Sequence, residues 1–528
     1  MTAEAEAVSP ADLSSLPTCA LTAPQLGDLE LLLNGALAPL TGFMTVADST
    51  AIADGWRLAD GTPFPVPITL DVPATVRAAE TPTDRILLAD PEGTPIAVMA
   101  IEERTALDGR GELVRLAGPV ASNRPPEHGP FRRLMLSPAA ARAKLGDRPV
   151  LAFATRGPLS SRQIGQVKHV AGQLKAQVLI LPLVSGHAAV VGSPQALIRS
   201  VLAAMTSLPA DSLVVPVPLP RHAGATDSAT GRAGELVLSG RVASTYGATH
   251  LMVEGSVPRA VDVPAGADLA ACARIPMLPA GDWAYDRRAE VWRPHALIEG
   301  GTEREDLTAD QLGDLLDAGS EIPDWVLPAA VARELRRVRK PRSERGIVLF
   351  LTGLSGSGKS TIARDLADVL AERSDRQVSL LDGDLVRQLL SAGLSFSRAD
   401  RDLNIARIGF VAAEIARHGG IAICAPIAPF AAARAQVRRM VNEVGDFFLI
   451  YVATPVEVCE ARDRKGLYAK ARAGLISQFT GVSDPYEEPA DAELVVDTSV
   501  MSRADAVQTV LGMLTSGGWL ADQPAIGR

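Results

Sequence analysis

Cysteine and aromatic residues are scarce in this chain of 528 residues. Phenylalanine, tryptophan and tyrosine together make up only 4% of it, and there are four cysteines: Cys19, Cys272, Cys424 and Cys459. The cysteines lie far apart and show none of the spacings of a metal site. We therefore expect buried, reduced thiols and a cytoplasmic protein, with neither a disulfide scaffold nor a structural zinc site.

Long apolar runs and an excess of positive charge are also missing. No run reaches the roughly 18 residues that a membrane span requires. Residues 1–6 lack the basic start and apolar core of a secretory signal. The formal net charge is −9, which argues against a general nucleic-acid binder. We expect a multidomain protein of this length with neither membrane nor nucleic-acid partners.

The strongest positive signal is a glycine loop between an expected strand and an expected helix. Residues 346–352 form a continuous apolar run, residues 353–361 read Gly-Leu-Ser-Gly-Ser-Gly-Lys-Ser-Thr, and residues 362–370 carry apolar side chains at helical spacing. This order is the context of a working phosphate-binding loop. Its glycines let backbone N–H groups face a polyphosphate at a helix N-terminus. The sequence therefore predicts a nucleoside triphosphate site.

Particular residues of this loop have predicted tasks. Lys359 is expected to reach the β- and γ-phosphates, and the Ser360 hydroxyl is expected to bind Mg²⁺, the cofactor that accompanies ATP. The residues predicted to bind ATP are Gly353, Ser355, Gly356, Ser357, Gly358, Lys359, Ser360 and Thr361.

A second apolar run, residues 377–381, ends in Asp382-Gly383-Asp384. Ligands bind at the carboxyl ends of strands in open α/β sheets. Two carboxylates there can hold metal-bound water and accept a proton from an attacking hydroxyl. An aromatic residue, two arginines and an asparagine follow: Phe396, Arg401, Arg407 and Asn404. Each arginine alone is typical of a solvated surface, but the cluster favours a site for a second substrate.

These motifs resemble those of the adenylylsulfate kinases, which phosphorylate the 3′-hydroxyl of adenosine 5′-phosphosulfate (APS). The resemblance covers about residues 345–500 and includes a lid-like run at 465–474. It implies that Asp384 is the general base or orients the hydroxyl, and that Asp382 lies near the metal and its waters. It implies APS contacts from Asp384, Arg387, Phe396, Arg401, Asn404, Ile427, Lys465 and Phe479.

Two residues depart from that family's pattern. Leu385 stands where the family usually has asparagine, and Ala428 replaces a serine next to the APS site. Neither change removes an indispensable group, although either could lower turnover.

In the first 335 residues, the spacing of side chains does not by itself indicate a chemical function. Short strands such as 67–72 predict a β-rich segment, and the apolar runs 149–154 and 177–181 predict parallel strands of an α/β segment. The scattered histidines, His222 among them, are typical of surface or structural residues. The basic, proline-interrupted run 336–345 indicates a linker.

This region resembles ATP sulfurylase (sulfate adenylyltransferase), the enzyme that makes APS. The resemblance rests on the runs 33–44, 136–142, 246–251, 298–302 and 322–325. The catalytic motifs, however, are altered. Where the family carries Gln-Thr-Arg-Asn-Pro followed by two histidines three residues apart, the corresponding residues here are Ala154, Arg156, Gly157, Ser160 and Gln163.

A second sulfurylase motif is altered as well. The family's Gly-Arg-Asp-His-Ala-Gly run is replaced by residues 254–259, so the carboxylate of Glu254 stands where a triphosphate would approach. Adenylyl transfer needs groups that neutralise charge on the leaving pyrophosphate. Losing several such groups together predicts an inactive site.

Together, these patterns and resemblances predict an α/β multidomain protein. We expect a β-rich, PUA-like domain at 1–135, a Rossmann-like, nucleotidylyltransferase-type α/β domain with a degenerate site at 136–335, a linker at 336–345 and a P-loop kinase domain at 346–528. The leading hypothesis is a homo-oligomeric APS kinase, acting on ATP and APS, fused to an inactive sulfurylase-like domain. A bifunctional sulfurylase–kinase and a non-catalytic nucleotide-sensing scaffold are the alternatives.

Overall fold

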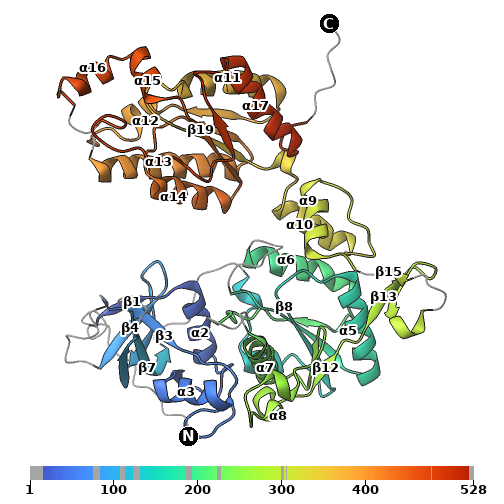
Figure 1. The fold of residues 1–528 in the computed structure, drawn as a ribbon. Coiled ribbons are helices and arrows are strands. Elements are labelled where there is room, and N and C mark those ends of the chain that lie inside the picture. The colour runs from blue at the N-terminus through green and yellow to red at the C-terminus, as the bar shows by residue number, and fades with distance from the viewer. Residues whose placement is uncertain are drawn as a thin grey trace. The chain divides into compact units, whose positions relative to one another are not determined.

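The computed structural model shows two compact units (Figure 1). The described residues are 16–74, 76, 84–107, 113–122, 131–185, 193–222, 228–298, 303–304, 306–395, 397–476 and 479–521. The first unit contains the chain up to residue 316 together with 320–339, and the second contains 317–319 and the chain from residue 340 onward.

The first unit opens with a mostly antiparallel sheet in the order β1-β4-β5-β7-β2, with β3 and β6 also paired to β7. Its strands are β1 (Thr18–Ala20), β2 (Gly42–Phe43), β3 (Leu70–Pro73), β4 (Arg85–Ala89), β5 (Pro95–Ala100), β6 (Glu103–Ala106) and β7 (Leu113–Ser122), and its helices are α2 (Ala23–Leu33) and α3 (Val46–Gly55). The long strand β7 holds this sheet together, because four other strands pair with it.

A five-stranded parallel sheet follows in the order β10-β9-β8-β11-β12. Its strands are β8 (Val150–Thr155), β9 (Gln177–Pro182), β10 (Leu213–Val214), β11 (His250–Val253) and β12 (Met277–Pro279). The helices are α4 (Pro138–Arg142), α5 (Ser161–Leu174), α6 (Pro194–Ala204), α7 (Ala229–Thr245) and α8 (Leu269–Ala273). The unit ends with β13 (Trp283–Asp286), β14 (Val291–Pro294), β15 (Glu303–Arg304), α9 (Ala309–Asp317, whose last residue groups with the second unit) and α10 (Ala329–Val338).

Strand β8 is buried on both faces, as its unbroken apolar run requires. Ala152 belongs to a core that also contains the β-rich segment, whereas Leu151 and Phe153 belong to a second core with α5, α6 and α10. Because the β-rich segment and one face of the parallel sheet share a core, they form one compact unit. The boundary expected near residue 135 stays a prediction.

The second unit is a five-stranded parallel sheet in the order β17-β18-β16-β19-β20. Its strands are β16 (Ile347–Thr352), β17 (Val378–Leu381), β18 (Ile421–Cys424), β19 (Asp446–Val452) and β20 (Leu494–Val496). Its helices are α11 (Lys359–Arg373), α12 (Gly383–Leu389), α13 (Arg398–Arg417), α14 (Ala431–Asn442), α15 (Val456–Arg462), α16 (Leu467–Arg472) and α17 (Arg503–Ser516).

Helices cover both faces of this sheet (Figure 1). Leu349 and Leu351 of β16 pack in the core with α11 and α17, and Val348 and Phe350 pack in the core with α13 and α14. Alternate side chains of one strand therefore supply two cores, and the carboxyl ends of the strands carry the loops.

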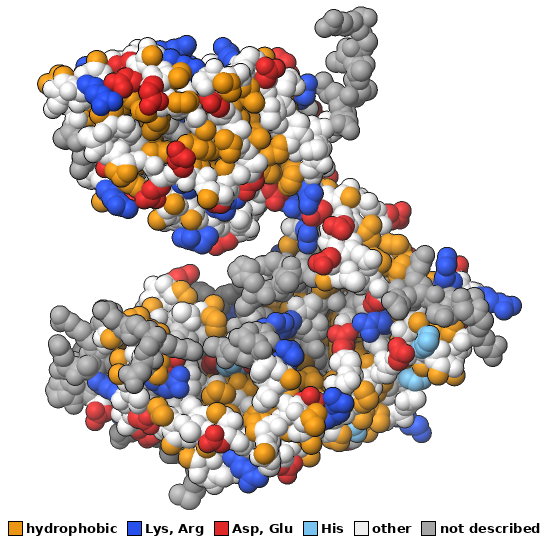
Figure 2. Space-filling model, in the orientation of Figure 1, with side chains coloured by type: hydrophobic (Ala, Val, Ile, Leu, Met, Phe, Trp, Pro, Cys, Tyr) orange, Lys and Arg blue, Asp and Glu red, His pale blue; other side chains and the backbone are white. Residues whose placement is uncertain are grey.

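The expected fold class is confirmed. The strands predicted at 149–154, 177–181, 346–352 and 377–381 are β8, β9, β16 and β17 with bounds within one residue. All four cysteines are buried and none forms a disulfide. In the described part of the chain, no helix is both long and apolar enough to cross a membrane. Figure 2 shows acidic and basic side chains intermingled on the drawn face.

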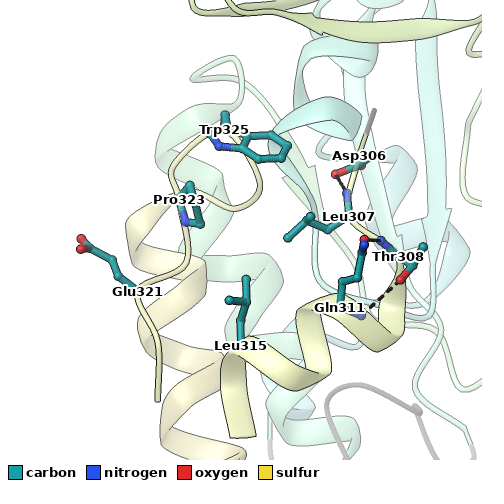
Figure 3. A pocket seen from close by; sticks show the side chains of 8 residues that line it. All are labelled: Asp306, Leu307, Thr308, Gln311, Leu315, Glu321, Pro323 and Trp325. Atoms are coloured by element: carbon teal, nitrogen blue, oxygen red, sulfur yellow. Dashed lines mark hydrogen bonds between the residues drawn. The ribbon is translucent and has the colours of Figure 1, made fainter. Parts of the chain in front are cut away.

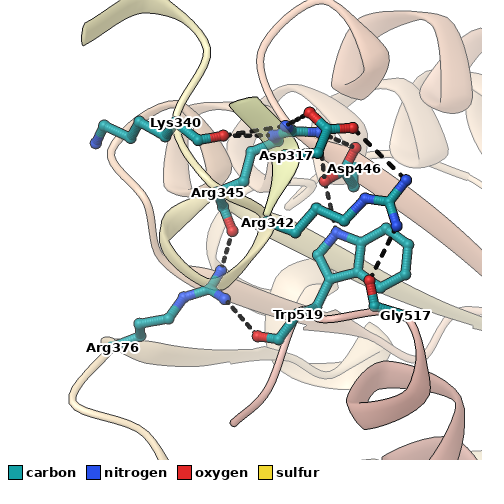
Figure 4. Close-up of polar contacts among 8 residues, drawn as sticks. All are labelled: Asp317, Lys340, Arg342, Arg345, Arg376, Asp446, Gly517 and Trp519. Carbon is teal, nitrogen blue, oxygen red and sulfur yellow. Dashed lines mark hydrogen bonds and ion pairs between the residues drawn. The ribbon is translucent and has the colours of Figure 1, made fainter. Parts of the chain in front are cut away.

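The basic run 336–345 contains more structure than a solvated linker implies. Its first residues complete α10, and Arg342–Glu344 form a 3₁₀ turn. Within the second unit, Arg345 forms ion pairs with Asp317 at 2.5 Å and with Asp446 at 3.5 Å (Figure 4).

An indole strengthens this polar cluster. Trp519 Nε1 donates to Asp446 at 2.6 Å, and the guanidinium of Arg342 lies 4.8 Å from the centre of the Trp519 ring (Figure 4). Arg376 donates to the backbone carbonyls of Arg345 and Trp519. Arg342 and Arg345 of the run are thus held within the second unit, because carboxylates and an aromatic face are available there.

Candidate functional site

The loop between β16 and α11 has a backbone that requires glycine. Gly353, Gly356 and Gly358 have φ angles of 145°, 77° and 105°. A Cβ added to Gly353 would lie 2.4 Å from the carbonyl oxygen of Val452. The loop therefore passes close to the end of β19 and leads into the start of α11, where the helix dipole and backbone N–H groups favour an anion.

Lys359 begins α11 and its side chain folds back over this loop. The side chain is only 6% exposed, and its Nζ donates to the carbonyl oxygens of Gly353 at 2.9 Å and Leu354 at 2.7 Å. Beside it, the buried hydroxyl Oγ of Ser357 has no hydrogen-bond partner among the described residues. A buried ammonium and a buried hydroxyl at an open glycine loop fit a bound polyphosphate.

Side chains from distant segments hold the loop in place. Thr454 Oγ1 and Thr498 Oγ1 donate to the carbonyl of Ser357 at 3.1 and 2.9 Å, and Tyr468 Oη donates to the carbonyl of Ser355 at 2.9 Å. The sequence reasoning missed these three supporting residues, since they belong to no phosphate-binding motif.

The carboxylates expected near the metal follow β17. Asp382 lies directly after the strand and forms an ion pair with Arg364 of α11 at 3.5 Å. Asp384 and Leu385 are residues of α12, but their side chains, like the whole of Phe396, lie outside the described residues. Ser360 follows Lys359 in the first turn of α11. The hydroxyl of Ser360 and the carboxylate of Asp382 are oxygen ligands of the kind Mg²⁺ prefers.

Arg401 of α13 lies in a nearly closed polar cluster. Its side chain is 11% exposed, forms an ion pair with Asp484 at 2.5 Å and lies 5.3 Å from the centre of the Phe430 ring. Its Nε and the Oδ1 of the buried Asn404 have no hydrogen-bond partners among the described residues. Buried polar atoms without partners are costly, so this pair indicates a ligand-binding position.

The remaining expected APS contacts are dispersed. Arg387 is half-buried, and its guanidinium donates to the carbonyl of Ser395 at 3.4 Å. The carbonyl of Ile427 accepts from Thr352 Oγ1 at 2.6 Å. Lys465 is exposed between α15 and α16, whereas Phe479 is buried against the Tyr468 ring at 5.0 Å. Phe479 therefore lies within the small apolar core of the lid-like segment.

The degenerate site of the first unit lies after β8. Ser160 is the N-cap of α5: its Oγ accepts from the N–H of Gln163 at 3.1 Å, and Gln163 Oε1 accepts from the N–H of Ser160 at 2.8 Å. The two side chains that replace the family's histidines form a capping box. Ala154 and Gly157 offer no polar side chain.

Arg156 is bound by the protein itself. Its guanidinium donates to the carbonyls of Leu219 at 2.9 Å and Pro220 at 3.0 Å, and it lies 3.8 Å from a carboxylate oxygen of Glu235. Burial lowers the pKa of Arg156 to about 10, although Glu235 opposes this effect. The one surviving cation of the motif thus has internal partners.

Glu235 continues into a buried chain of charges. His222 Nδ1 donates to Glu235 at 2.6 Å, and its Nε2 donates to Asp28 at 3.1 Å. Burial alone would lower the pKa of His222, but the hydrogen bonds to Asp28 and Glu235 outweigh it and raise this pKa to about 9. His222 is therefore a charged structural residue at neutral pH.

Glu254 has a partner within the first unit. Arg162 lies 3.2 Å from Glu254 and 2.8 Å from Asp306, so one guanidinium bridges the two carboxylates. Asp306 borders a cavity of about 570 Å³ that Trp325 also lines (Figure 3). This cavity is lined by Asp306, Leu307, Thr308, Gln311, Leu315, Glu321, Pro323 and Trp325.

This fold and these sites define a class of protein in which a P-loop phosphotransferase unit is joined to an adenylyltransferase-type unit. Residues 345–497 match the family model of adenylylsulphate kinase, residues 132–338 that of ATP-sulfurylase and residues 1–125 that of a PUA-like domain. These matches confirm both resemblances found in the sequence.

Whole-chain relatives agree. The chain is 36% identical to the sulfate adenylyltransferase of Mycosarcoma maydis, over 95% of this chain and 94% of the relative, and 35% identical to that of Phaeosphaeria nodorum, over 97% and 95%. The solved structure titled hexameric APS kinase from Thiobacillus denitrificans has a TM-score of 0.79 and 34% identity, over 97% of this chain and 95% of that one. The chain belongs to the sulfate adenylyltransferase family and carries both a sulfurylase and an APS kinase domain.

The charge chain around His222 predicts a pH-dependent stability. Because the folded pKa of about 9 exceeds the ordinary 6.5, the stabilisation is complete below pH 6.5 and is lost as the pH rises through 9. The shift corresponds to about 3 kcal/mol. Denaturant unfolding followed by tryptophan fluorescence should show this loss between pH 6.5 and 9.5. His222→Gln should reduce the pH dependence of the free energy of unfolding. An equal loss of this free energy in variant and wild type would contradict the charged state assigned to His222.

Proposed function

We propose that this chain is an adenylylsulfate kinase that transfers the γ-phosphoryl group of MgATP to the 3′-hydroxyl of APS, giving 3′-phosphoadenylyl sulfate and ADP. The observation that carries this proposal is the presence of two features in one unit. They are the glycine loop under Lys359, and the buried Arg401 and Asn404, each with a polar atom that lacks a hydrogen-bond partner among the described residues. The first fits a triphosphate and the second fits a polar acceptor.

Each residue has a task in this reaction. Phosphoryl transfer depends on positioning and on offsetting charge more than on covalent chemistry. Lys359 would hold the β- and γ-phosphates, and Ser360 and Asp382 would hold the metal. When bound with ATP, Mg²⁺ supplies further positive charge at the phosphates. Asp384 would orient the 3′-hydroxyl and take its proton as the new oxygen–phosphorus bond forms.

Arg387, Phe396, Arg401, Asn404, Ile427, Lys465 and Phe479 are proposed to bind APS. A sulfated adenylate offers negative oxygens and a flat base. Arginines suit the first because the guanidinium presents several donors in one plane, and an aromatic face suits the second.

We further propose that the sulfurylase domain is inactive. The support is physical: Ser160 and Gln163 satisfy each other as a helix cap, and Arg156 is bound to carbonyls and to Glu235. A pyrophosphate leaving group needs cationic donors, but the guanidinium of Arg156 already donates to backbone carbonyls, and Ser160 and Gln163 carry no charge. The bifunctional alternative is favoured by the names of the whole-chain relatives, so it is tested directly below.

The chain is also proposed to form homo-oligomers in the cytoplasm. A relative with 34% identity over nearly the whole chain is titled hexameric. Four buried thiols without disulfides suit a reducing compartment.

Lys359→Ala should lower kcat for APS phosphorylation at least 100-fold, because removing a positioned cation from the transferring phosphate costs about 3 kcal/mol of transition-state stabilisation. ADP release with APS and MgATP measures this. Arg373→Ala, an exposed residue of the same helix, is the matched control. Near-normal turnover of Lys359→Ala would refute the role of the loop.

Arg401→Ala should raise the KM for APS at least tenfold while the KM for ATP changes less than twofold, because Arg401 lies on the acceptor side. The KM for APS of Arg401→Lys should fall between those of Arg401→Ala and wild type, since a lysine keeps the charge but not the planar donors. Arg417→Ala, at the exposed end of α13, should have the same KM for APS as wild type. Equal use of other nucleoside monophosphates would contradict the acceptor assignment.

Pyrophosphate release from ATP and sulfate should be undetectable in the intact protein, whereas its APS kinase activity should be present. Arg156→Ala should leave the kinase activity unchanged. The measurement is a phosphate-coupled pyrophosphatase assay with and without sulfate. Sulfate-dependent release that Arg156→Ala abolishes would instead establish the bifunctional alternative.

A further inference from the structure

The loop between β18 and α14 has an unusual backbone conformation at Ala428. Residues 425–430 form this loop, which is called the acceptor loop because it contains Ile427, a proposed APS contact. Ala428 is 1% exposed and has a φ angle of 46°, in the left-handed region that alanine rarely adopts. A residue other than glycine keeps such a conformation only where surrounding contacts enforce it. The contacts of Ala428 therefore determine where Ile427 lies.

One of these contacts comes from a buried arginine of α14. Arg434 is 3% exposed, and its Nη1 donates to the carbonyl oxygen of Ala428 at 2.8 Å. Its Nη2 donates to the carbonyl oxygen of Glu487 at 2.7 Å, and the guanidinium lies 5.9 Å from the centre of the Tyr486 ring. Because the guanidinium is a rigid plane, two such bonds fix the positions of both carbonyls relative to α14.

The second carbonyl belongs to the other side of the proposed acceptor site. The backbone N–H of Glu487 donates to the carbonyl of Pro429 at 2.9 Å, so this segment is bonded to the acceptor loop directly as well. Three residues before Glu487, Asp484 forms the ion pair with Arg401 at 2.5 Å. Arg434 therefore joins the segment that orients Arg401 to the acceptor loop.

The glycine loop contacts the acceptor loop but also has supports of its own. Thr352, the last residue of β16, donates through Oγ1 to the carbonyl of Ile427 at 2.6 Å. The glycine loop that follows is held by the hydrogen bonds of Thr454, Thr498 and Tyr468. Loss of the buried arginine should consequently disturb the acceptor side of the site more than the ATP side.

We propose that Arg434 is a positioning residue for the phosphoryl acceptor. It holds Ala428 in its left-handed conformation and so fixes the acceptor loop with Ile427. Through the second carbonyl, it also fixes the segment whose Asp484 orients Arg401. Arg434 acts through these two carbonyls and not by contact with a substrate. This inference rests on the APS kinase activity proposed above and adds a residue that the sequence motifs did not indicate.

Substitution of Arg434 in the full-length protein is the first test. Arg434→Met should raise the KM for APS at least tenfold, because both sides of the acceptor site lose their common support. The dissociation constant of ADP, measured by calorimetry, should change less than twofold, which also shows that the unit is folded. The KM for APS of Arg434→Lys should lie between those of Arg434→Met and wild type, because an ammonium group lacks the planar fork.

A neighbouring arginine provides the matched control. Arg438 lies one turn further along α14 and is likewise bound by the protein, through ion pairs with Glu493 at 2.5 Å and Asp491 at 3.4 Å. Arg438→Met should leave the KM for APS unchanged. An Arg434→Lys variant that binds ADP at least tenfold more weakly would overturn the positioning role, because the arginine would then support the whole unit and not the acceptor side.

Glycine at position 428 provides the second test. Glycine adopts a positive φ angle without steric cost, so adding Ala428→Gly to Arg434→Met should lower the raised KM for APS at least threefold. Ala432→Gly, at an exposed position of α14, should bring no such recovery.

The outcomes separate this inference from the proposed function. A wild type that phosphorylates APS, with an Arg434→Met variant whose KM for APS is within twofold of it, would overturn the positioning role alone. Equal KM values for Arg434→Met with and without Ala428→Gly would overturn it too. A wild type without APS-dependent ADP release would overturn the proposed function and this inference together.

Discussion

A side chain cannot be accommodated at Gly353, and the proposed nucleotide site of the second unit depends on that constraint. Strands β16 and β19 are paired along their full common length, up to Thr352 opposite Tyr451. The loop that follows β16 therefore passes so close to the end of β19 that a Cβ would lie 2.4 Å from the carbonyl oxygen of Val452. A phosphate bound at this loop would meet backbone N–H groups and a helix N-terminus, which act together on an anion.

The two units repeat the same strand, loop and helix but use their polar groups differently. After β8, Ser160 and Gln163 cap backbone N–H groups of α5, and Arg156 donates to backbone carbonyls and lies beside Glu235. After β16, the hydroxyl of Ser357 is buried without a partner among the described residues. A buried polar group without a partner destabilises the fold, so it is expected to persist where a ligand supplies the missing bond. This contrast supports catalysis in the second unit and its loss in the first.

Helix α13 combines packing with the proposed acceptor site. Ile405 and Ile408 contribute to the core, and Arg401 and Asn404 each have a polar atom that lacks a hydrogen-bond partner among the described residues. The packing of the helix against the sheet therefore fixes where these two polar side chains lie.

The sequence by itself determined the strands, the glycine loop and the families, because these are local patterns: apolar runs for strands buried on both faces, and glycines where the backbone must approach an anion. It placed Lys359 at the end of the glycine loop and Asp382 at the end of a strand for the same reason. The partners of those residues were decided only by the tertiary structure. His222 meets Asp28 across 194 positions, Arg401 meets Asp484, and Thr498 supports Ser357. No local pattern specifies such pairs, because each depends on where the packing of two sheets and their helices brings distant segments together.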